Sequence, residues 1–312
     1  MTWLGTLRAA LGLALAACAA GCATPGPQPG PESRGSARCG GEPIFAAGGE
    51  RATLWVRNSS EFRAASEIIY RAARDALATG LADPAWTAEP SQAGDLSALP
   101  PAVVMDIDET VLDNSEPQAE MMLKGTCFNE FPAAWDAWLA KRSAPAVPGA
   151  AEFIRAARSM KDPSGRPVRV FFITNRECAR RGGVDSACPQ QDDTAANLAS
   201  LGLGSPTLAD DLMLKGERPE WESEKLARRE AVASSHRIVL NVGDDLADFL
   251  PGVRRATVAS RDAARCARED WWGRGWFLLP NPMYGSWLVA LGQDLNAALA
   301  AEPAILGDCP GR

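Results

Sequence analysis

The sequence predicts an α/β fold with a mostly parallel sheet. Short apolar runs recur along the chain, stretches with helical periodicity separate them, and several runs end directly in acidic or polar residues. Since parallel strands need long crossover connections, usually helices, this alternation favours an α/β protein. The chain has 312 residues, of which 46% are hydrophobic and 23% charged, and this balance excludes a disordered protein.

The N-terminal segment, residues 1–22, has the composition of an export signal. A run of Leu and Ala follows Arg8, and it is too short to remain as a membrane span. Its end, Leu15-Ala16-Ala17-Cys18, resembles a bacterial lipobox, which predicts lipidation of Cys18. Cys22 is the second candidate, and a secretory signal without lipid is the alternative. The expected location is the bacterial cell envelope, at the outer membrane or the periplasmic face.

Residues 23–50 are predicted to form a tether, because Pro and Gly at this density prevent packing and helix formation. A folded domain is expected over 51–312, held near a membrane by the lipid but working in water. Export permits disulfides, and the chain has eight cysteines. Cys178 and Cys188 are predicted to pair, since they flank a short loop with two glycines, and the other pairings stay open.

The first elements of the domain follow from local patterns. Apolar residues spaced three and four apart predict a helix over 58–81. After a Pro-rich loop, the apolar run 103–105 predicts a buried strand that ends in acids. Residues 113–148 are predicted to be a helical insertion directly after this strand.

The rest of the chain alternates in the same way. Four further apolar runs predict strands, and stretches with helical periodicity separate them. The charged residues of 222–230 are expected on the solvated face of the last helix. The strands are expected at 168–173, 212–214, 238–242 and 276–279, and the helices at 149–160, 194–201 and 222–234.

Two acids follow the first strand, at the edge of the sheet where α/β proteins bind ligands. They are Asp106 and Asp108, and a spacing of two sends both side chains to the same side. Two converging carboxylates repel each other, and a divalent cation removes that conflict. A solvated loop or a helix cap is the alternative for this short motif alone.

Polar groups follow three other predicted strands. Asp244 and Asp248 come after one of them. For the Gly-Asp-Asp motif alone, an ordinary turn without a role in binding is the alternative. Thr174-Asn175-Arg176 and Lys215 come after the other two. Hydroxyl, amide, ammonium and carboxylate groups at neighbouring strand ends are the components of a phosphoryl-transfer site.

Composition narrows the chemistry further. The chain has one histidine, which excludes multi-histidine zinc sites and mechanisms that need two histidines, so any bound metal is expected to have oxygen ligands. The net charge of −7 argues against a nucleic-acid polymer as a partner.

These strand-end signatures, in this order, resemble the haloacid dehalogenase superfamily of phosphohydrolases. More narrowly, they are similar to the class C acid phosphatases, bacterial surface lipoproteins often described as 5′-nucleotidases. The resemblance covers about 55–291 and implies a Rossmann-like sheet with helices on both faces, plus a small helical subdomain. The motifs that carry it are 106–115, 174–176, 243–249 and 280–285.

The resemblance implies Mg²⁺ as the cofactor and a role for each matched acid. Asp106 would be the nucleophile that forms an aspartyl-phosphate, and also a metal ligand. Asp108 would offer its backbone carbonyl to the metal, while its side chain would protonate the leaving oxygen and later activate water, which implies an acidic pH optimum. Asp244 would bind the metal, and Asp248 would act through a metal-bound water or Lys215.

The resemblance also implies substrate contacts. Thr174 and the backbone of Asn175 would hold the phosphoryl oxygens, with Arg176 beside them, and Lys215 would neutralise charge on the nucleophile and the phosphate. The aromatic residues Trp135 and Tyr284 are candidates to stack on a nucleobase or a nicotinamide ring, whereas core packing explains Trp138 at least as well.

The expected activity is hydrolysis of small phosphomonoesters, nucleoside 5′-monophosphates first among them. Two alternatives stay open, namely phosphate transfer to an alcohol or nucleoside, and nucleotide binding without turnover. The expected partners are the substrate and a membrane reached through the lipid; the oligomeric state, including a homodimer, stays open. The chain departs from the family pattern at Asp245, where Asn is usual, and at 116–118 and 286–288, near the expected substrate mouth.

Overall fold

The computed structural model describes residues 49–126, 130–205, 207–292, 295–303 and 309. The predicted signal, the lipidation site and nearly all of the predicted tether lie outside these residues. Of the helices in the described ranges, none combines the length and the apolar composition that a membrane crossing requires.

Five strands form one parallel sheet in the order β3-β2-β1-β4-β5, which confirms the predicted fold class. Each lies where the sequence places a strand. The order of the strands reverses between β1 and β4, and this is where α/β proteins open a ligand-binding crevice. The strands are β1 (Pro101–Met105), β2 (Arg169–Glu177), β3 (Leu212–Lys215), β4 (Arg237–Gly243) and β5 (Trp276–Leu278).

Helices precede, connect and follow the strands. Two of them, α3 and α4, lie in the segment that the sequence marks as an insertion. Helix α6 begins at Pro189 rather than at 194, since proline fits the first turn of a helix. The sequence patterns did not indicate α1, α7, α9, α10 or α11, and α1 begins at Gly49, within the last residues of the predicted tether. Up to β4 the helices are α1 (Gly49–Asn58), α2 (Ser60–Ala82), α3 (Ser115–Lys124), α4 (Phe131–Lys141), α5 (Ala150–Ser159), α6 (Pro189–Ser200), α7 (Leu208–Asp211) and α8 (Leu226–Ala233). After β4 they are the 3₁₀ helices η1 (Leu246–Asp248) and η2 (Glu269–Trp271), and α9 (Val258–Cys266), α10 (Ser286–Ala290) and α11 (Leu295–Ala300).

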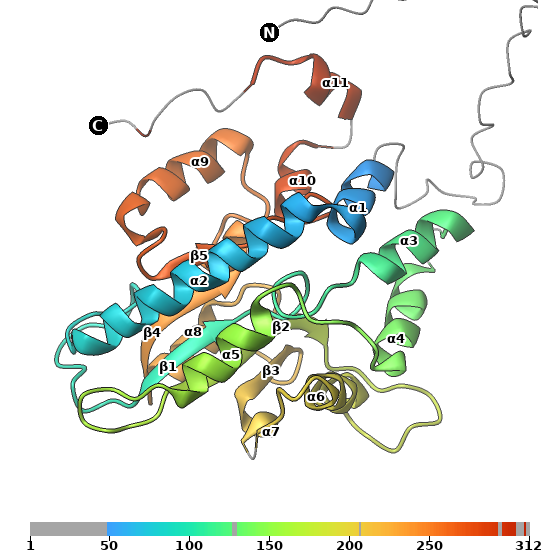
Figure 1. Ribbon diagram of the computed structural model, residues 1–312. Helices are drawn as coiled ribbons and strands as arrows, with labels where there is room; N and C mark the ends of the chain where they lie inside the picture. Colours follow the sequence, from blue (N-terminus) through green and yellow to red (C-terminus); the bar gives the residue numbers. More distant parts are fainter. Residues whose placement is uncertain (1–48, 127–129, 206, 293–294, 304–308, 310–312) are drawn as a thin grey trace, which may run out of the picture. The chain divides into compact units, whose positions relative to one another are not determined.

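Side chains of the central strand alternate between two apolar layers. Val103 and Met105 belong to the layer that includes Phe153 of α5, and Val104 belongs to the layer that includes Val232 of α8. Helices α2 and α5 pack side by side on the first face, as Figure 1 shows. Because both faces of the sheet are covered, the inner strands are apolar on both sides, which is why they appear in the sequence as unbroken apolar runs.

Two disulfides tie down segments of the described chain. Cys178 and Cys188 are bonded, which confirms the pair predicted from the sequence, and the bond closes the loop between β2 and α6. A second bond joins Cys266, at the end of α9, to Cys309. The first bond therefore restrains the segment that directly follows Thr174-Asn175-Arg176.

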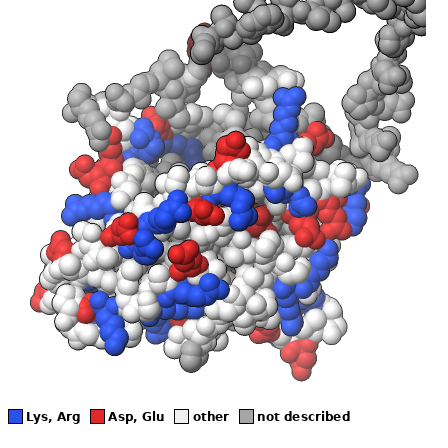
Figure 2. Space-filling model, viewed as in Figure 1, with Lys and Arg blue, Asp and Glu red and all other residues white. Residues whose placement is uncertain are grey.

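The face formed by α2 and α5 carries charges of both signs. Figure 2 shows acidic and basic side chains interspersed over it, and pairs such as Arg71–Glu67 and Arg74–Asp75 lie along α2. This face therefore offers no continuous basic surface of the kind that nucleic acids bind.

Candidate active site

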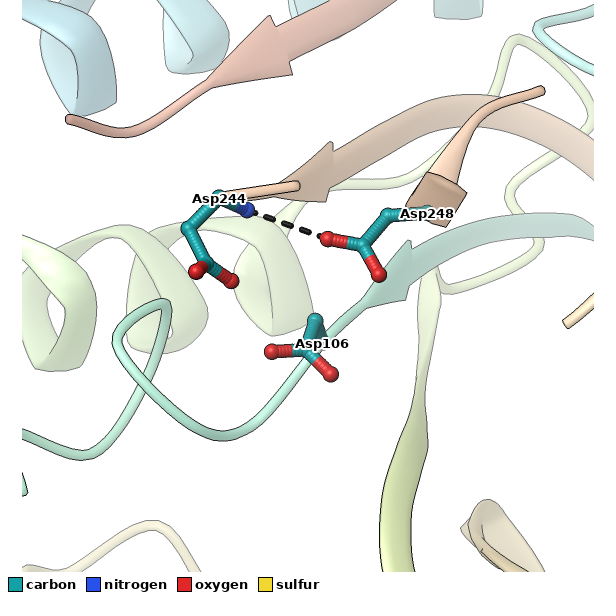
Figure 3. A group of neighbouring side chains, drawn as sticks. All are labelled: Asp106, Asp244 and Asp248. Atoms are coloured by element: carbon teal, nitrogen blue, oxygen red, sulfur yellow. Dashed lines mark hydrogen bonds between the residues drawn. The ribbon is translucent and has the colours of Figure 1, made fainter. Parts of the chain in front are cut away.

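Three acids meet where the strand order reverses, at the carboxyl ends of β1 and β4. Asp106 follows β1, and its backbone N–H donates to the carbonyl of Val242 in β4 at 3.0 Å. Asp244 follows β4, and Asp248 ends η1 just beyond it. One carboxylate oxygen from each of these three acids lies within 4.8 Å of the others. Figure 3 shows the three carboxylates converging from the two strand ends.

A tight turn brings Asp248 back onto the end of β4. Its Oδ2 accepts hydrogen bonds from the backbone N–H groups of Asp244 at 3.1 Å, drawn in Figure 3, and of Asp245 at 3.0 Å. Gly243 allows this approach, because a Cβ at that position would collide with the Asp248 carboxylate. The Gly-Asp-Asp motif is therefore a turn, and the turn places two acids beside Asp106.

A buried lysine balances part of this negative charge. The Nζ of Lys225 donates to Oδ1 of Asp106 and, at 2.7 Å, to Oδ1 of Asp248. Lys225 is the N-cap residue of α8 and is only 4% exposed. Buried charges are costly unless each has a partner of opposite sign. Here three carboxylates face one ammonium group, which leaves an excess of negative charge when all three are ionised.

The pKa values reflect that excess. Burial raises the pKa of Asp106 to about 7; Lys225 opposes the rise, whereas Asp248 and Asp108 add to it. Burial, Asp106 and Asp248 likewise raise the pKa of Asp244. Burial alone would lower the pKa of Lys225, but Asp106 and Asp248 raise it above its usual value.

The position of Lys225 corrects the sequence-based expectation for Lys215. Lys215 ends β3 and lies 3.4 Å from Glu177 of β2, with its side chain 32% exposed. Its ammonium group therefore pairs with Glu177 of the neighbouring strand β2. The chain turns at Gly216, and the lysine that contacts Asp106 is Lys225, further along the chain.

The sequence did not indicate Lys225 as a site residue, because 222–230 has the composition of a solvated helix face. In the structure Lys225, Arg228 and Arg229 are all buried. Arg228 donates to the carbonyl of Thr174 at 2.5 Å and to Oδ1 of Asn175 at 2.8 Å. Charged residues alone do not reveal burial, because their partners come from segments remote in sequence.

Asp108 points to a different set of partners. Arg176 donates to its carboxylate with Nη2 at 2.7 Å and Nε at 3.0 Å, and Asn114 donates at 2.9 Å. Thr174 is fully buried, with its Oγ1 3.4 Å from Asp108. The remaining nitrogen of Arg176 donates to Thr194 at 2.8 Å, so Arg176 is engaged by the protein itself, although it borders the cleft.

The loop between β1 and α3 is held by a buried network. Glu109 takes a left-handed conformation with φ 60°, and its carboxylate accepts from the backbone N–H of Asn114 at 2.8 Å. Burial and the charges of nearby acids raise the pKa of Glu109 well above its usual value. Trp138 of α4 donates to Oδ1 of Asn114 at 2.9 Å, which confirms a packing role for this tryptophan and connects α4 to the loop.

The second strand end is held by equally specific bonds. Thr110 donates to Oδ1 of Asp244 at 3.1 Å, and Asn281 donates to Oδ2 at 2.8 Å. Asp245 caps η1 and accepts from the backbone N–H of Ser286 at 2.5 Å. The sequence pattern marks Asp245 as a departure. It includes Asn281 in the motif 280–285 but gives it no role, and its part in the site depends on the loop after β5.

A cleft of about 1010 Å³ opens over the acids. It is bordered by Asp106, Asp108, Asp244 and Asp248, by Asn175, and by the two aromatic residues expected at the substrate, Trp135 and Tyr284. The ring of Trp135 stacks on Phe131 with centroids 6.0 Å apart. The cleft thus combines an acidic floor with aromatic walls, and it is large enough for a small organic phosphate.

The donor set fits a divalent cation. Carboxylate oxygens are the ligands that Mg²⁺ and similar hard cations prefer. Burial, and after it the charges of neighbouring acids, raises the pKa values of Asp106 and Asp244, so a cation beside them would favour their ionised forms. Asp248 shares its oxygens with Lys225 and two backbone N–H groups, so Asp106 and Asp244 are the better ligands. The Asp108 side chain is not part of this cluster, which leaves its expected contact through the backbone carbonyl as a prediction.

Comparison with known proteins agrees with this geometry. A family model described as HAD superfamily, subfamily IIIB (Acid phosphatase) matches residues 59–287. A solved structure of the class C acid phosphatase from Bacillus anthracis is similar, with a TM-score of 0.62 and 29% sequence identity over 81% of this chain and 93% of that one. A crystal structure of the class C acid phosphatase from the same organism with tungstate bound has a TM-score of 0.61 and 30% identity, over 80% of this chain and 92% of that one.

The matched region contains the five strands, the acidic cluster and, apart from Val289, the residues that line the cleft. The chain therefore belongs to HAD subfamily IIIB, the class C acid phosphatases, and is a phosphomonoester hydrolase.

Proposed function

We propose that the protein is a Mg²⁺-dependent acid phosphatase that hydrolyses small phosphomonoesters, chiefly nucleoside 5′-monophosphates, through an aspartyl-phosphate on Asp106. The observation that carries the proposal is the convergence of Asp106, Asp244 and Asp248 around Lys225 on the floor of an aromatic-walled cleft.

Asp106 is suited to be the nucleophile. Its Oδ1 is bound by Lys225, and Oδ2 makes no hydrogen bond with the described part of the chain. A carboxylate attacks a phosphate dianion slowly because both are negative, and Lys225 offsets that repulsion on the enzyme side. When bound, Mg²⁺ would supply further charge neutralisation at the phosphoryl oxygens.

Asp108 is suited to be the acid and base. In the first step an oxygen of Asp106 forms a bond to phosphorus, the bond to the leaving oxygen breaks, and the Asp108 carboxyl gives that oxygen its proton. In the second step water attacks phosphorus and passes a proton to Asp108, and the bond between phosphorus and Asp106 breaks. Arg176 and Asn114 hold the Asp108 carboxylate and act as positioning residues.

The test is phosphate release from AMP and p-nitrophenyl phosphate, with Mg²⁺ or with EDTA. We expect metal-dependent release by the wild type and a loss of about 10³-fold or more in Asp106→Asn. Acid quenching during turnover of ³²P-labelled substrate is expected to leave label on the wild-type protein and none on the variant. Full activity of Asp106→Asn would reject the assignment of the nucleophile.

Excess nucleoside in the same assay separates hydrolysis from phosphate transfer, because transfer would produce a phosphorylated nucleoside. Nucleotide binding measured by calorimetry without any phosphate release would instead favour a binding protein.

We also propose that the domain is anchored to the cell envelope through lipidated Cys18, on the basis of the lipobox-like sequence. Labelled palmitate is expected to appear in the wild type and in Cys22→Ala but not in Cys18→Ala. Label retained by Cys18→Ala and lost from Cys22→Ala would move the anchor to Cys22.

A further inference from the structure

Two buried polar atoms on the wall of the cleft lack a hydrogen-bond partner among the described residues. They are Oε1 of Gln118 and Oη of Tyr284. Gln118 is 2% exposed. Buried polar atoms are nearly always hydrogen-bonded in folded proteins, so two such atoms on one cleft indicate groups that a ligand completes.

Gln118 is also held in a fixed relation to the reacting groups. It lies in the first turns of α3, and its backbone N–H donates to the carbonyl of Asn114 at 3.3 Å. The side chain of the same Asn114 donates to Asp108 at 2.9 Å. The backbone of Gln118 is therefore attached to the loop that carries the proposed acid and base, and its side chain borders the same cleft.

The same cleft presents aromatic surface. Phe131 and Trp135 of α4 stack on each other, and both border the cleft together with Tyr284. Aromatic side chains accept a flat ring on their faces but do not distinguish its edges. An enzyme that distinguishes one ring from another needs a polar group that reaches the edge of the ring, and Gln118 is a polar residue on this cleft.

A carboxamide has a donor and an acceptor side by side, and it pairs with a ring edge that offers the complementary acceptor and donor, as adenine does with its amino group and adjacent ring nitrogen. We propose that Gln118 binds the amino-bearing edge of a nitrogen heterocycle in the leaving group and makes aminopurine nucleotides the preferred substrate class. This rests on the proposed phosphatase function.

The experiment compares AMP with purine riboside 5′-monophosphate, which differs only by lacking the amino group. The wild type is expected to show a kcat/KM for AMP about tenfold or more above that for the deaminated analogue. In Gln118→Leu, which keeps the size and removes both polar atoms, the ratio is expected to fall close to one. Glu116→Gln is the control, since Glu116 is exposed on the same helix, and its ratio should match the wild type.

A ratio near one in the wild type would overturn the proposal, and this comparison needs no variant to fold. A Gln118→Leu protein that loses activity on both substrates while keeping the wild-type ratio would also overturn it, because that is the result of a merely structural role. Absence of phosphate release from both nucleotides and from p-nitrophenyl phosphate would instead show that the proposed function itself is wrong.

Discussion

The ammonium group of Lys225 lies between the carboxylates of Asp106 and Asp248, where burial makes every unbalanced charge costly. We predict that Lys225→Ala lowers kcat/KM for p-nitrophenyl phosphate by about 10²- to 10³-fold, because the ammonium group then no longer offsets its share of the repulsion between nucleophile and phosphate. Lys215→Ala is the matched control and is expected to stay within about twofold of wild type, since Lys215 pairs with Glu177. Equal losses in the two variants would contradict this assignment.

Asp245 stands where the family pattern has Asn, and its charge is compensated by contacts within the protein. Its carboxylate accepts from the backbone N–H groups of Ala247 at 2.9 Å and Ser286 at 2.5 Å, and Arg261 lies 3.7 Å away. Burial pushes the pKa of Asp245 upward, but the hydrogen bonds from Ser286 and Ala247 and the charge of Arg261 outweigh it, so the pKa lies below its usual value.

We therefore predict that Asp245→Asn lowers the free energy of unfolding by about 1–2 kcal/mol near pH 7, the size of a lost charged cap and hydrogen bond. A depressed carboxyl pKa stabilises the fold above its unfolded value near ~3.9 and loses that effect as the pH falls through the folded value. The difference between variant and wild type, measured by urea unfolding, should thus be constant from about pH 5 to 8 and shrink below about pH 4. The metal concentration needed for half-maximal activity should not change, and a clear rise would show that Asp245 also helps to bind the metal.

Among the elements, α4 is bonded to two other parts of the chain, and its aromatic residues form one wall of the cleft. Trp138 ties it to Asn114 in the loop after β1. Arg181, just after β2, bridges to Asp136 of α4 at 2.6 Å and to Asp193 of α6 at 2.7 Å. Through these bonds the aromatic side chains of α4 keep their place relative to the acids.

Removal of this bridge is expected to loosen α4. We predict that Arg181→Ala destabilises the protein by about 1–2 kcal/mol and raises KM for AMP more than it lowers kcat, because Trp135 loses its fixed place while the acids keep theirs. Urea unfolding and steady-state kinetics measure the two effects. Arg180→Ala, at an exposed neighbouring position, should change neither. A fall in kcat with KM unchanged would show that the bridge acts on the chemistry instead.

For the whole molecule, the cluster of acids makes stability depend on metal and pH together. The folded pKa of Asp106, about 7, lies above the unfolded value near ~3.9, so without metal the folded state holds the proton more tightly and stability falls as the pH rises between these values. A divalent cation bound by these acids would take the place of the proton as the compensating charge.

We accordingly predict that Mg²⁺ raises Tm relative to EDTA, and that the increase is larger at pH 8 than at pH 5.5. At a concentration of 100 Kd the stabilisation would be about 2.7 kcal/mol, if the cation binds only the folded state. Thermal unfolding at the two pH values, each with Mg²⁺ and with EDTA, measures the effect. An increase of equal size at both pH values would contradict the link between the metal and these carboxylates.

Local patterns alone were enough for the strands, for α2, α3, α4, α5, α6 and α8, for the acids at the strand ends and for the pair Cys178–Cys188. These features depend on neighbours in the chain: apolar periodicity decides burial, and the carboxyl ends of parallel strands must meet at one edge. Asp106, Asp244 and Asp248 were found in this way because each directly follows or closely succeeds a strand.

Only the tertiary structure decided which lysine contacts those acids and which side chains border the cleft. Lys225 comes from a segment with no strand-end signature, and its partner Asp106 lies 119 residues away in the sequence. Asn281 belongs to a motif that follows a strand, but its partner Asp244 lies 37 residues away. A charged or amide side chain has the same local pattern whether it is solvated or buried. The partner that compensates its burial is set by the packing of the whole chain, and this is why Lys215 and Lys225 could be told apart only in three dimensions.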